Sequence, residues 1–388
     1  MTAPARGFPV AEFQARLGRA QALMDKADLA GMLLTTEAEI RYFSGFQTLF
    51  WQSPTRPWFL FVPAEGKPVA VIPEIGAALM RRTWVEDIRT WPAPQPGDDG
   101  ISLLTDLLEP FARRRARIGL LKGHETHLRM PLGDYERLIA ALPGLGVADA
   151  TGIVRSLRMV KSAAEIEKIA HICSVASRSF ARVPDFAAEG RPLDEVFRAF
   201  RRACLEEGVD DVPYLVGGAD QGGYHDVISP PDARPLRGGD ILMLDTGAVF
   251  DGYFCDFDRN WAIGRASDAA RRAHEVLFRA TEAGMDAARP GATCRDIFAA
   301  MRAVIARHDT GPGDVGRLGH GLGMQLTEWP SLAGFDDTVL QENMVLTLEP
   351  SLSYGDARIM VHEENIVVTS GAPRLLSERA PAGLPVIG

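Results

Sequence analysis

ILMLDTGAVFDGYFCDFDRN, residues Ile241–Asn260, is the stretch of sequence that decides the fold of this chain. Its first four residues, Ile241–Leu244, are all apolar and predict a buried strand that ends at Asp245. Asp251-Gly252 is a strong signal for a two-residue hairpin turn, because both central positions of the favoured turn need a positive φ. The stretch therefore predicts an antiparallel hairpin with acidic residues near its core.

The predicted turn also sets the register of the hairpin. Phe250 should pair with Tyr253, and counting back along both strands places Asp245 opposite Asp258. Asp256 then lies diagonally from Asp245, at a backbone separation of roughly 7–8 Å. Side chains alternate between the two faces of a strand, so all three carboxylates should project from one face.

Carboxylates next to an apolar strand are costly to bury unless a cation compensates them. Arg259 points to the opposite face in this register, so it does not neutralise the cluster. A solvated outer face would need no cation, but the apolar run beside Asp245 favours burial. The hairpin therefore suggests a bound cation.

Three later segments repeat this theme of a metal-ligating side chain beside an apolar run. GHGLG places His320 among glycines, which permit close approach of the backbone. NMVLTLEP is an apolar strand that ends in Glu349, and RIMVHEENIVVT carries Glu363 and Glu364 inside an apolar strand. Each of these could be an ordinary structural or surface residue, but together they extend the pattern of the hairpin.

The combined set is rich in oxygen ligands and contains one imidazole: Asp245, Asp256, His320, Glu349 and one of Glu363 or Glu364. Two divalent ions would neutralise its four carboxylates. Hard oxygen ligands with a single histidine suit Mn²⁺, Fe²⁺, Co²⁺ or Zn²⁺. Two such ions about 3.5–4 Å apart activate a water and polarise a carbonyl, which is hydrolytic chemistry.

Composition excludes several other classes of protein. The chain has 388 residues, 46% of them hydrophobic and 24% charged, which is typical of a globular protein with two domains. The net charge of −9 disfavours a nucleic-acid partner. No apolar run is long enough for a membrane helix, and no export signal is seen. The four cysteines show no CxxC spacing, so we expect a cytoplasmic protein.

The two halves of the chain differ in pattern. Residues 1–150 alternate helical and strand patterns and predict an α/β domain. Residues 151–388 predict an α+β domain with antiparallel hairpins, and Ser162 with Glu165 forms a capping box at the start of a long helix. Further helices are expected at 11–24, 101–112, 193–207, 266–288 and 293–308, and strands at 31–35, 58–63, 69–73 and 117–121.

The order of these motifs resembles the pita-bread metallohydrolases, which include aminopeptidase P, prolidase, methionine aminopeptidase and creatinase. DTGAVFDGYFCDFDR is similar to the family's D-x-G-x(4)-G-Y-x-x-D-x-[ST]-R element, and GHGLG and the strand ending in Glu349-Pro350 follow in the family's order. RLGRAQALMDKADLAGMLLTT and IRYFSGF resemble the creatinase/prolidase N-terminal domain. The resemblance implies such a domain at 1–150 and a pita-bread catalytic domain at 151–388.

The resemblance also implies roles for individual residues. Asp245, Asp256, His320 and Glu349 would bind metal, with Asp256 bridging two ions. Glu364 is favoured as the last ligand, because Glu364-Asn365 resembles the family's E-D, and the alternative is Glu363. The catalytic groups implied are Glu349, His320, His225 and His362, where His225 is the nearest match to a histidine ahead of the first aspartate.

Two departures from the family pattern bear on the activity. Thr327 stands where the peptidases carry the histidine of H-E-x-P, and a threonine cannot shuttle a proton at neutral pH as an imidazole does. Asp258 stands where the family has Ser or Thr, and His362 takes the place of an arginine. These departures weaken the case for Xaa-Pro cleavage.

Three functions therefore stay open. The first is a hydrolase that cleaves Xaa-Pro amide bonds in short peptides with two metal ions, manganese among the candidates. The second is a small-molecule enzyme on the same fold, similar to ectoine hydrolase, creatinase or dimethylsulfoniopropionate lyase; the aromatic loop at 48–56, with Trp51, could cover such a substrate. The third is a non-catalytic binding module. The resemblance further implies a homodimer.

Overall fold

The computed structural model describes residues 2–53, 56–310 and 316–388. Contacts divide the chain into two compact units, Ala5–Arg158 and Met159–Gly388, with the first few residues counted in the second unit. The sequence placed the division after residue 150. The structure continues the first unit through most of helix α6 (Thr151–Met159).

The first unit is built on a mixed sheet. Within its described residues the strand order is β4-β3-β2-β1-β5-β6. Central strand β1 pairs antiparallel with β2 and parallel with β5, so the sheet combines both pairing modes. The strands are β1 (Gly31–Leu34), β2 (Phe59–Pro63), β3 (Val69–Pro73), β4 (Asp87–Trp91), β5 (Arg117–Leu120) and β6 (Gly146–Asp149).

Helices cover this sheet, and they follow the predicted amphipathic pattern. The principal ones are α1 (Val10–Lys26), α2 (Glu37–Ser44), α4 (Ile101–Arg113) and α5 (Leu132–Ala141), with the short α3 (Ala77–Met80). The apolar face of α4 packs with β-strand side chains in one buried cluster. β1 is buried along its whole length, which explains why it reads as a continuous apolar run. The α/β prediction for this unit is confirmed.

Trp51 lies inside the first unit rather than at an open surface. Its indole ring is buried, packs 5.8 Å from the ring of Trp58, and stacks beneath the guanidinium of Arg129 at 5.0 Å. The same guanidinium donates hydrogen bonds to the carbonyls of Trp51 and Ser53. The Trp51 side chain is therefore part of the core of this unit and does not lie open to cover a substrate. Residues 54–55 of the predicted loop lie outside the described residues.

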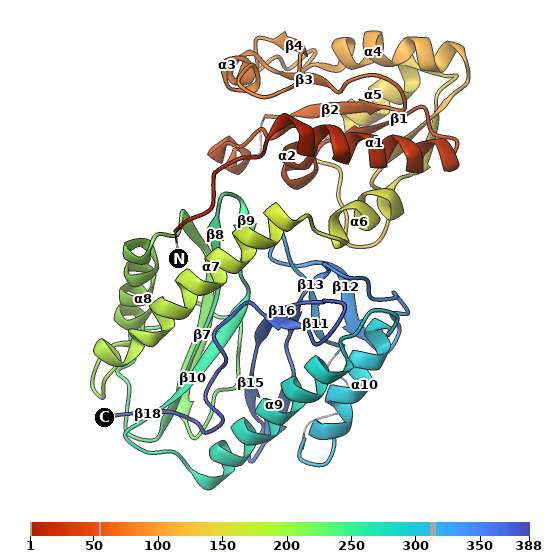
Figure 1. Ribbon diagram of the computed structural model, residues 1–388. Coiled ribbons are helices and arrows are strands. Elements are labelled where there is room, and N and C mark those ends of the chain that lie inside the picture. Colours follow the sequence, from red (N-terminus) through yellow and green to blue (C-terminus); the bar gives the residue numbers. More distant parts are fainter. Residues whose placement is uncertain (1, 54–55, 311–315) are drawn as a thin grey trace. The chain divides into compact units, whose positions relative to one another are not determined.

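The second unit contains two larger sheets and a two-stranded ribbon (Figure 1). The first sheet has the order β18-β10-β8-β7 with β9 paired to β8, and the second has the order β12-β11-β13-β16-β17. The first sheet comprises β7 (Asp211–Gln221), β8 (Asp240–Phe250), β9 (Tyr253–Phe254), β10 (Phe257–Ile263) and β18 (Val386–Ile387). The second comprises β11 (Arg317–Gly321), β12 (Glu328–Ala333), β13 (Val345–Leu348), β16 (Glu364–Val367) and β17 (Arg374–Leu375); β14 (Ser351–Tyr354) and β15 (Arg358–Val361) form the ribbon.

Two pairs of helices flank these sheets. Helices α7 (Ala163–Ala181) and α8 (Leu193–Glu207) pack against β8 and β7, whereas α9 (Asp268–Ala287) and α10 (Cys294–Ile305) pack against the second sheet and the ribbon (Figure 1). The capping box predicted for α7 is present: Ser162 accepts from the N–H of Glu165, whose side chain accepts from the N–H of Ser162. The second unit is α+β, as predicted.

The hairpin of β8 and β9 has the predicted register. Phe250 pairs with Tyr253, and Asp258 pairs with Asp245. Asp251 and Gly252 adopt positive φ angles of 47° and 75°, as a two-residue hairpin turn requires. One expectation differs: Asp245 lies in the middle of β8, because the strand continues to Phe250 and pairs with β7 on its other side.

None of the helices formed by the described residues combines the length and the apolar character that crossing a membrane requires.

Candidate metal centre

Five ligand-type side chains converge in the second unit, and both of its larger sheets contribute. Each of the five sits within a strand or beside the end of one. Asp245 lies in β8, Asp256 in the break between β9 and β10, His320 in β11, Glu349 directly after β13, and Glu363 directly before β16. Residues far apart in sequence are therefore brought together by strand pairing.

Carboxylate oxygens form the centre of this group. One oxygen from each of Asp245, Asp256 and Glu363 lies within 4.8 Å of the other two. His320 Nε2 lies 3.4 Å from Asp256 Oδ2 and 3.7 Å from Glu349 Oε2. Four of the five residues are buried, whereas the Glu349 side chain is 34% exposed. The cluster is therefore reached from solvent on the Glu349 side.

The carboxylates are held in an unfavourable electrostatic environment. Burial, followed by the nearby charge of Glu349, raises the pKa of Asp245 to about 7. Burial and the charges of Asp245 and Glu349 raise the pKa of Asp256 well above its usual range, and Glu363 responds in the same way. Loss of hydration raises the pKa of Glu349 itself to about 7, although Arg317 opposes the shift. At neutral pH such a set must either take up protons or bind added positive charge.

The tautomer of His320 points to the sign of that charge. Its Nδ1 lies 2.8 Å from the carbonyl oxygen of Gly321, so Nδ1 carries the proton and donates it there. Burial lowers the pKa of His320 to about 4, which keeps the ring neutral. The lone pair on Nε2 therefore faces two carboxylate oxygens, and a histidine fixed in this way is typical of metal sites.

The residues present fit divalent metal ions. A neutral imidazole nitrogen and several carboxylate oxygens share one small space, and Asp245 Oδ1 has no hydrogen-bond partner among the described residues. An ion at that point would satisfy these atoms together. Oxygen donors with one imidazole are the chemistry expected for Mn²⁺, Fe²⁺, Co²⁺ or Zn²⁺.

The structure places Glu364, which the sequence favours as the last ligand, outside the carboxylate cluster. Glu364 Oε2 accepts hydrogen bonds from Arg259, at 3.1 Å, and from Ser377, while Oε1 accepts from the N–H of Ala380 at 2.8 Å. Burial alone would raise its pKa, but the Arg259 guanidinium lowers the pKa of Glu364 to about 2. Glu363, the alternative, is the residue whose carboxylate joins the cluster.

The two histidines expected to assist catalysis also lie elsewhere. His362 shares the side of Glu364, because alternate residues of an extended chain face the same way; its Nε2 lies 3.6 Å from Glu364 Oε1, and its ring packs 5.4 Å from the ring of His274. His225 is exposed, with Nδ1 3.1 Å from the carbonyl oxygen of Ala357 in the turn between β14 and β15. Neither residue joins the carboxylate cluster.

Sequence reasoning missed a residue that lies beside the centre. The Tyr214 side chain in β7 lowers the pKa of the Asp245 carboxyl, opposing the effect of burial. β7 pairs with β8 and places Tyr214 opposite Gly247. A search for hydroxyl side chains on the strand predicted to pair with that of Asp245 could have found Tyr214.

The two positions that depart from the family pattern have different surroundings. Thr327 is exposed in the loop between β11 and β12. Asp258 is buried, with Oδ2 accepting from Asn260 Nδ2 at 2.5 Å, and Oδ1 has no partner in the described part of the chain. Burial raises the pKa of Asp258 well above its usual range, although the Arg259 charge opposes the shift.

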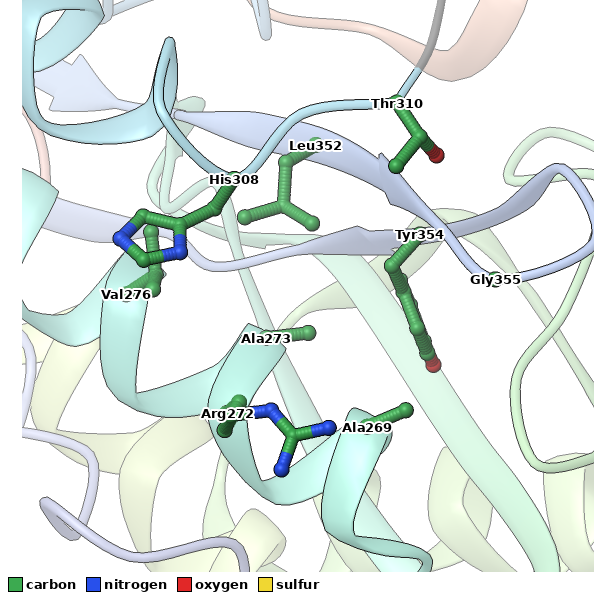
Figure 2. A pocket seen from close by; sticks show the side chains of 9 residues that line it. All are labelled: Ala269, Arg272, Ala273, Val276, His308, Thr310, Leu352, Tyr354 and Gly355. Atoms are coloured by element: carbon green, nitrogen blue, oxygen red, sulfur yellow. The ribbon is translucent and has the colours of Figure 1, made fainter.

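A separate cavity of about 180 Å³ opens between α9, the segment after α10 and β14 (Figure 2). Its lining includes the basic side chains Arg272 and His308 and the apolar side chains Val276 and Leu352. Its lining contains no carboxylate, so this cavity is not part of the metal centre.

Comparisons with known proteins agree with this geometry. The model of metallopeptidase family M24 matches residues 167–370, and that of the creatinase/prolidase N-terminal domain matches residues 16–160. A probable dipeptidase PepE from Mycobacterium bovis is 29% identical over 387 residues, covering 98% of each chain. A Xaa-Pro dipeptidase from Pyrococcus furiosus is 30% identical over 230 residues, which is 58% of this chain and 64% of that protein.

A solved structure is similar over nearly the whole chain. The crystal structure of dipeptidase PepE from Mycobacterium ulcerans matches with a TM-score of 0.83 and 30% identity, covering 98% of this chain and 99% of that one. The second unit thus has the pita-bread fold, and the first is a creatinase-type N-terminal domain. The clustered carboxylates, the fixed histidine and the family match lead to one conclusion: this chain belongs to metallopeptidase family M24 and is a metal-dependent peptidase.

Proposed function

We propose that this protein is a dinuclear metal-dependent peptidase that cleaves short peptides, with Xaa-Pro dipeptides as the first substrates to test. The observation that carries the proposal is the convergence of Asp245, Asp256 and Glu363 beside the lone pair of His320. Two relatives, a probable dipeptidase and a Xaa-Pro dipeptidase, support the substrate class.

Two ions are proposed because the charges and donors require more than one. Asp245, Asp256, Glu349 and Glu363 together bring four negative charges, and one neutral imidazole completes the set. Asp245 would serve one ion, His320 and Glu349 the other, with Asp256 and Glu363 shared between them. Manganese is the first metal to test, with iron, cobalt and zinc as alternatives.

Two bound ions would supply Lewis acidity for the scissile carbonyl and for the attacking water. The chain itself contributes proton handling and orientation. Glu349 is the most exposed carboxylate of the set, which places it to accept a proton and return it to the leaving amine. Gly321 fixes the His320 ring.

We also propose a cytoplasmic location and a homodimer. All four cysteines are free and buried, which fits a reducing compartment. The dimer rests on the family resemblance, and the mass in solution measured by light scattering tests it.

A small-molecule substrate is the second candidate, and Thr327 favours it. This exposed residue offers a hydroxyl where the peptidases of the family carry an imidazole. We expect Thr327→His to raise turnover of Xaa-Pro dipeptides from a low baseline by about a hundredfold, the lower end of the range for a positioned acid–base group. A high baseline in the unchanged protein, with no gain in the variant, would show that the imidazole is dispensable.

The decisive experiment combines metal analysis with substrate profiling. Protein purified without chelators should carry up to two divalent ions per chain and should hydrolyse Xaa-Pro dipeptides in preference to ectoine-like and betaine-like compounds. The matched control is Asp256→Asn, which keeps the shape of the side chain and removes its charge. Protein that binds no divalent ion, or an Asp256→Asn variant with full turnover, contradicts the proposal.

A further inference from the structure

Asp256 lies at a break in the strand ladder. β9 ends at Phe254 and β10 begins at Phe257, so the peptide groups of Asp256 pair with no strand in the described part of the chain. Instead its N–H donates to Asn365 Oδ1 at 3.0 Å, and Asn365 Nδ2 donates to its carbonyl at 2.6 Å. Both residues are buried. One carboxamide therefore replaces a strand as the partner of this residue.

Glu363 is held in a corresponding way from the other sheet. It lies between β15 and β16, and its carbonyl accepts a hydrogen bond from the Arg259 guanidinium at 2.9 Å. The same guanidinium donates to the carbonyl of Asp258 at 2.6 Å and pairs with the Glu364 carboxylate at 3.1 Å. Arg259 thus ties the start of β10 to the two residues at the start of β16.

A third side chain supports the Asp256 backbone. The hydroxyl of Thr347 in β13 donates to the Asp256 carbonyl at 3.1 Å. Thr347 pairs with His320 on one side and with Asn365 on the other. Thr347 therefore links the backbone of Asp256 to β13, the strand that lies between the strand of His320 and the strand that follows Glu363.

We propose that Asn365 and Arg259 are positioning residues that set the separation between the Asp256 and Glu363 carboxylates. Each comes from the chain segment of one carboxylate and holds the backbone of the other. Because both carboxylates would hold the ions, the bonds of Asn365 and Arg259 would keep these ligands at the separation that binding of two ions needs. The inference rests on the proposed dinuclear function and adds the residues that make the second ion bind.

The physical reason is that each of these bonds leaves little freedom to adjust. Asn365 uses its donor and its acceptor on the two backbone groups of one residue, so its amide cannot rotate without losing both bonds. The Arg259 fork is planar and donates to four oxygens at once, those of the Asp258, Glu363 and Glu378 carbonyls and of the Glu364 carboxylate. Residues that orient ligands in this way typically change metal affinity by about 10–100-fold when they are replaced.

The test is binding of Mn²⁺ to the full-length, metal-free protein. Calorimetry measures the affinity, and electron paramagnetic resonance shows whether the bound ions are coupled. Asn365→Ala should weaken the second ion by about tenfold or more and replace the spectrum of a coupled pair by that of isolated Mn²⁺. Thr347→Val, which removes one hydroxyl at constant shape, should weaken it in the same direction but less. Thr281→Val is the matched control, because its buried hydroxyl donates to the Phe278 carbonyl inside α9, and it should bind like the unchanged protein.

Folded Asn365→Ala protein that binds two ions with unchanged affinity and coupling overturns the inference. Should Asn365→Ala fail to fold by circular dichroism, the comparison of Thr347→Val with Thr281→Val decides, and equal binding by the two overturns it. An unchanged protein that binds one ion or none instead refutes the proposed dinuclear function, so the two failures are distinguishable.

Discussion

The adjacent glutamates Glu363 and Glu364 provide the sharpest test of the site, because glutamine in place of each should have opposite effects. Burial raises the pKa of Glu363 well above its usual range, and the charges of the neighbouring carboxylates raise it further. Removing its charge should therefore stabilise the metal-free protein at neutral pH and abolish tight binding of the second ion. Glu364 pairs with Arg259, so removing its charge leaves a buried guanidinium without its partner.

The magnitude for Glu364 follows from its pKa. A fall from 4.5 to about 2 corresponds to roughly 3 kcal/mol of native-state stabilisation, since one pKa unit is about 1.4 kcal/mol. We expect Glu364→Gln to lose about that much free energy of unfolding, in line with the cost of breaking a buried ion pair, and to keep its metal affinity.

The assay has two parts. Urea unfolding of chelator-treated protein gives the free energies of unfolding, and Mn²⁺ titration gives the affinities. The reasoning is refuted if Glu364→Gln loses the metal while Glu363→Gln retains it, or if Glu363→Gln is the less stable of the two without metal.

Three further predictions follow from other contacts. Because folding raises the pKa values of Asp245 and Glu349 to about 7, their contribution to the stability of the metal-free protein is complete below about pH 4 and is lost as the pH rises through 7; melting at pH 5.5 and pH 8 checks this, and equal melting temperatures would contradict it. Tyr214→Phe should weaken metal binding by about tenfold with little change in melting temperature, and unchanged affinity by calorimetry would show that the hydroxyl is not needed. Lys168→Met breaks a buried ion pair of 2.6 Å with Asp251 and should cost about 3 kcal/mol in urea unfolding; a loss below about 1 kcal/mol would place the pair among weak surface contacts.

The hairpin could be predicted in detail because its determinants are local. Asp251-Gly252 fixes the turn, and the turn fixes every pairing back to Asp245 and Asp258. The capping box at Ser162 is local in the same sense. Signals of this kind need only neighbouring residues, so the sequence was sufficient for both.

The last ligand could not be predicted in the same way. A shift of one residue in an extended segment moves a side chain to the other face, and nothing local distinguishes Glu363 from Glu364. The difference comes from Arg259 and Ser377, which are distant in sequence and donate hydrogen bonds to the Glu364 carboxylate. The roles of Tyr214 and Asn365 were missed for the same reason, since their partners lie on other strands.

His225 shows the opposite failure. Its position relative to Asp245 was inferred from an approximate match in spacing, and the loop after β7 carries it to the surface beside Ala357. Loops change length easily, so a spacing that passes through one says little about the side chain beyond it.

The candidate ligands are divided between two sheets, with Asp245 and Asp256 on one and His320, Glu349 and Glu363 on the other. An ion bound there would link the two sheets, and this link would exist only in the folded state. Metal supply and folding are then thermodynamically linked, so scarcity of the ion would lower the stability of the second unit as well as slow turnover.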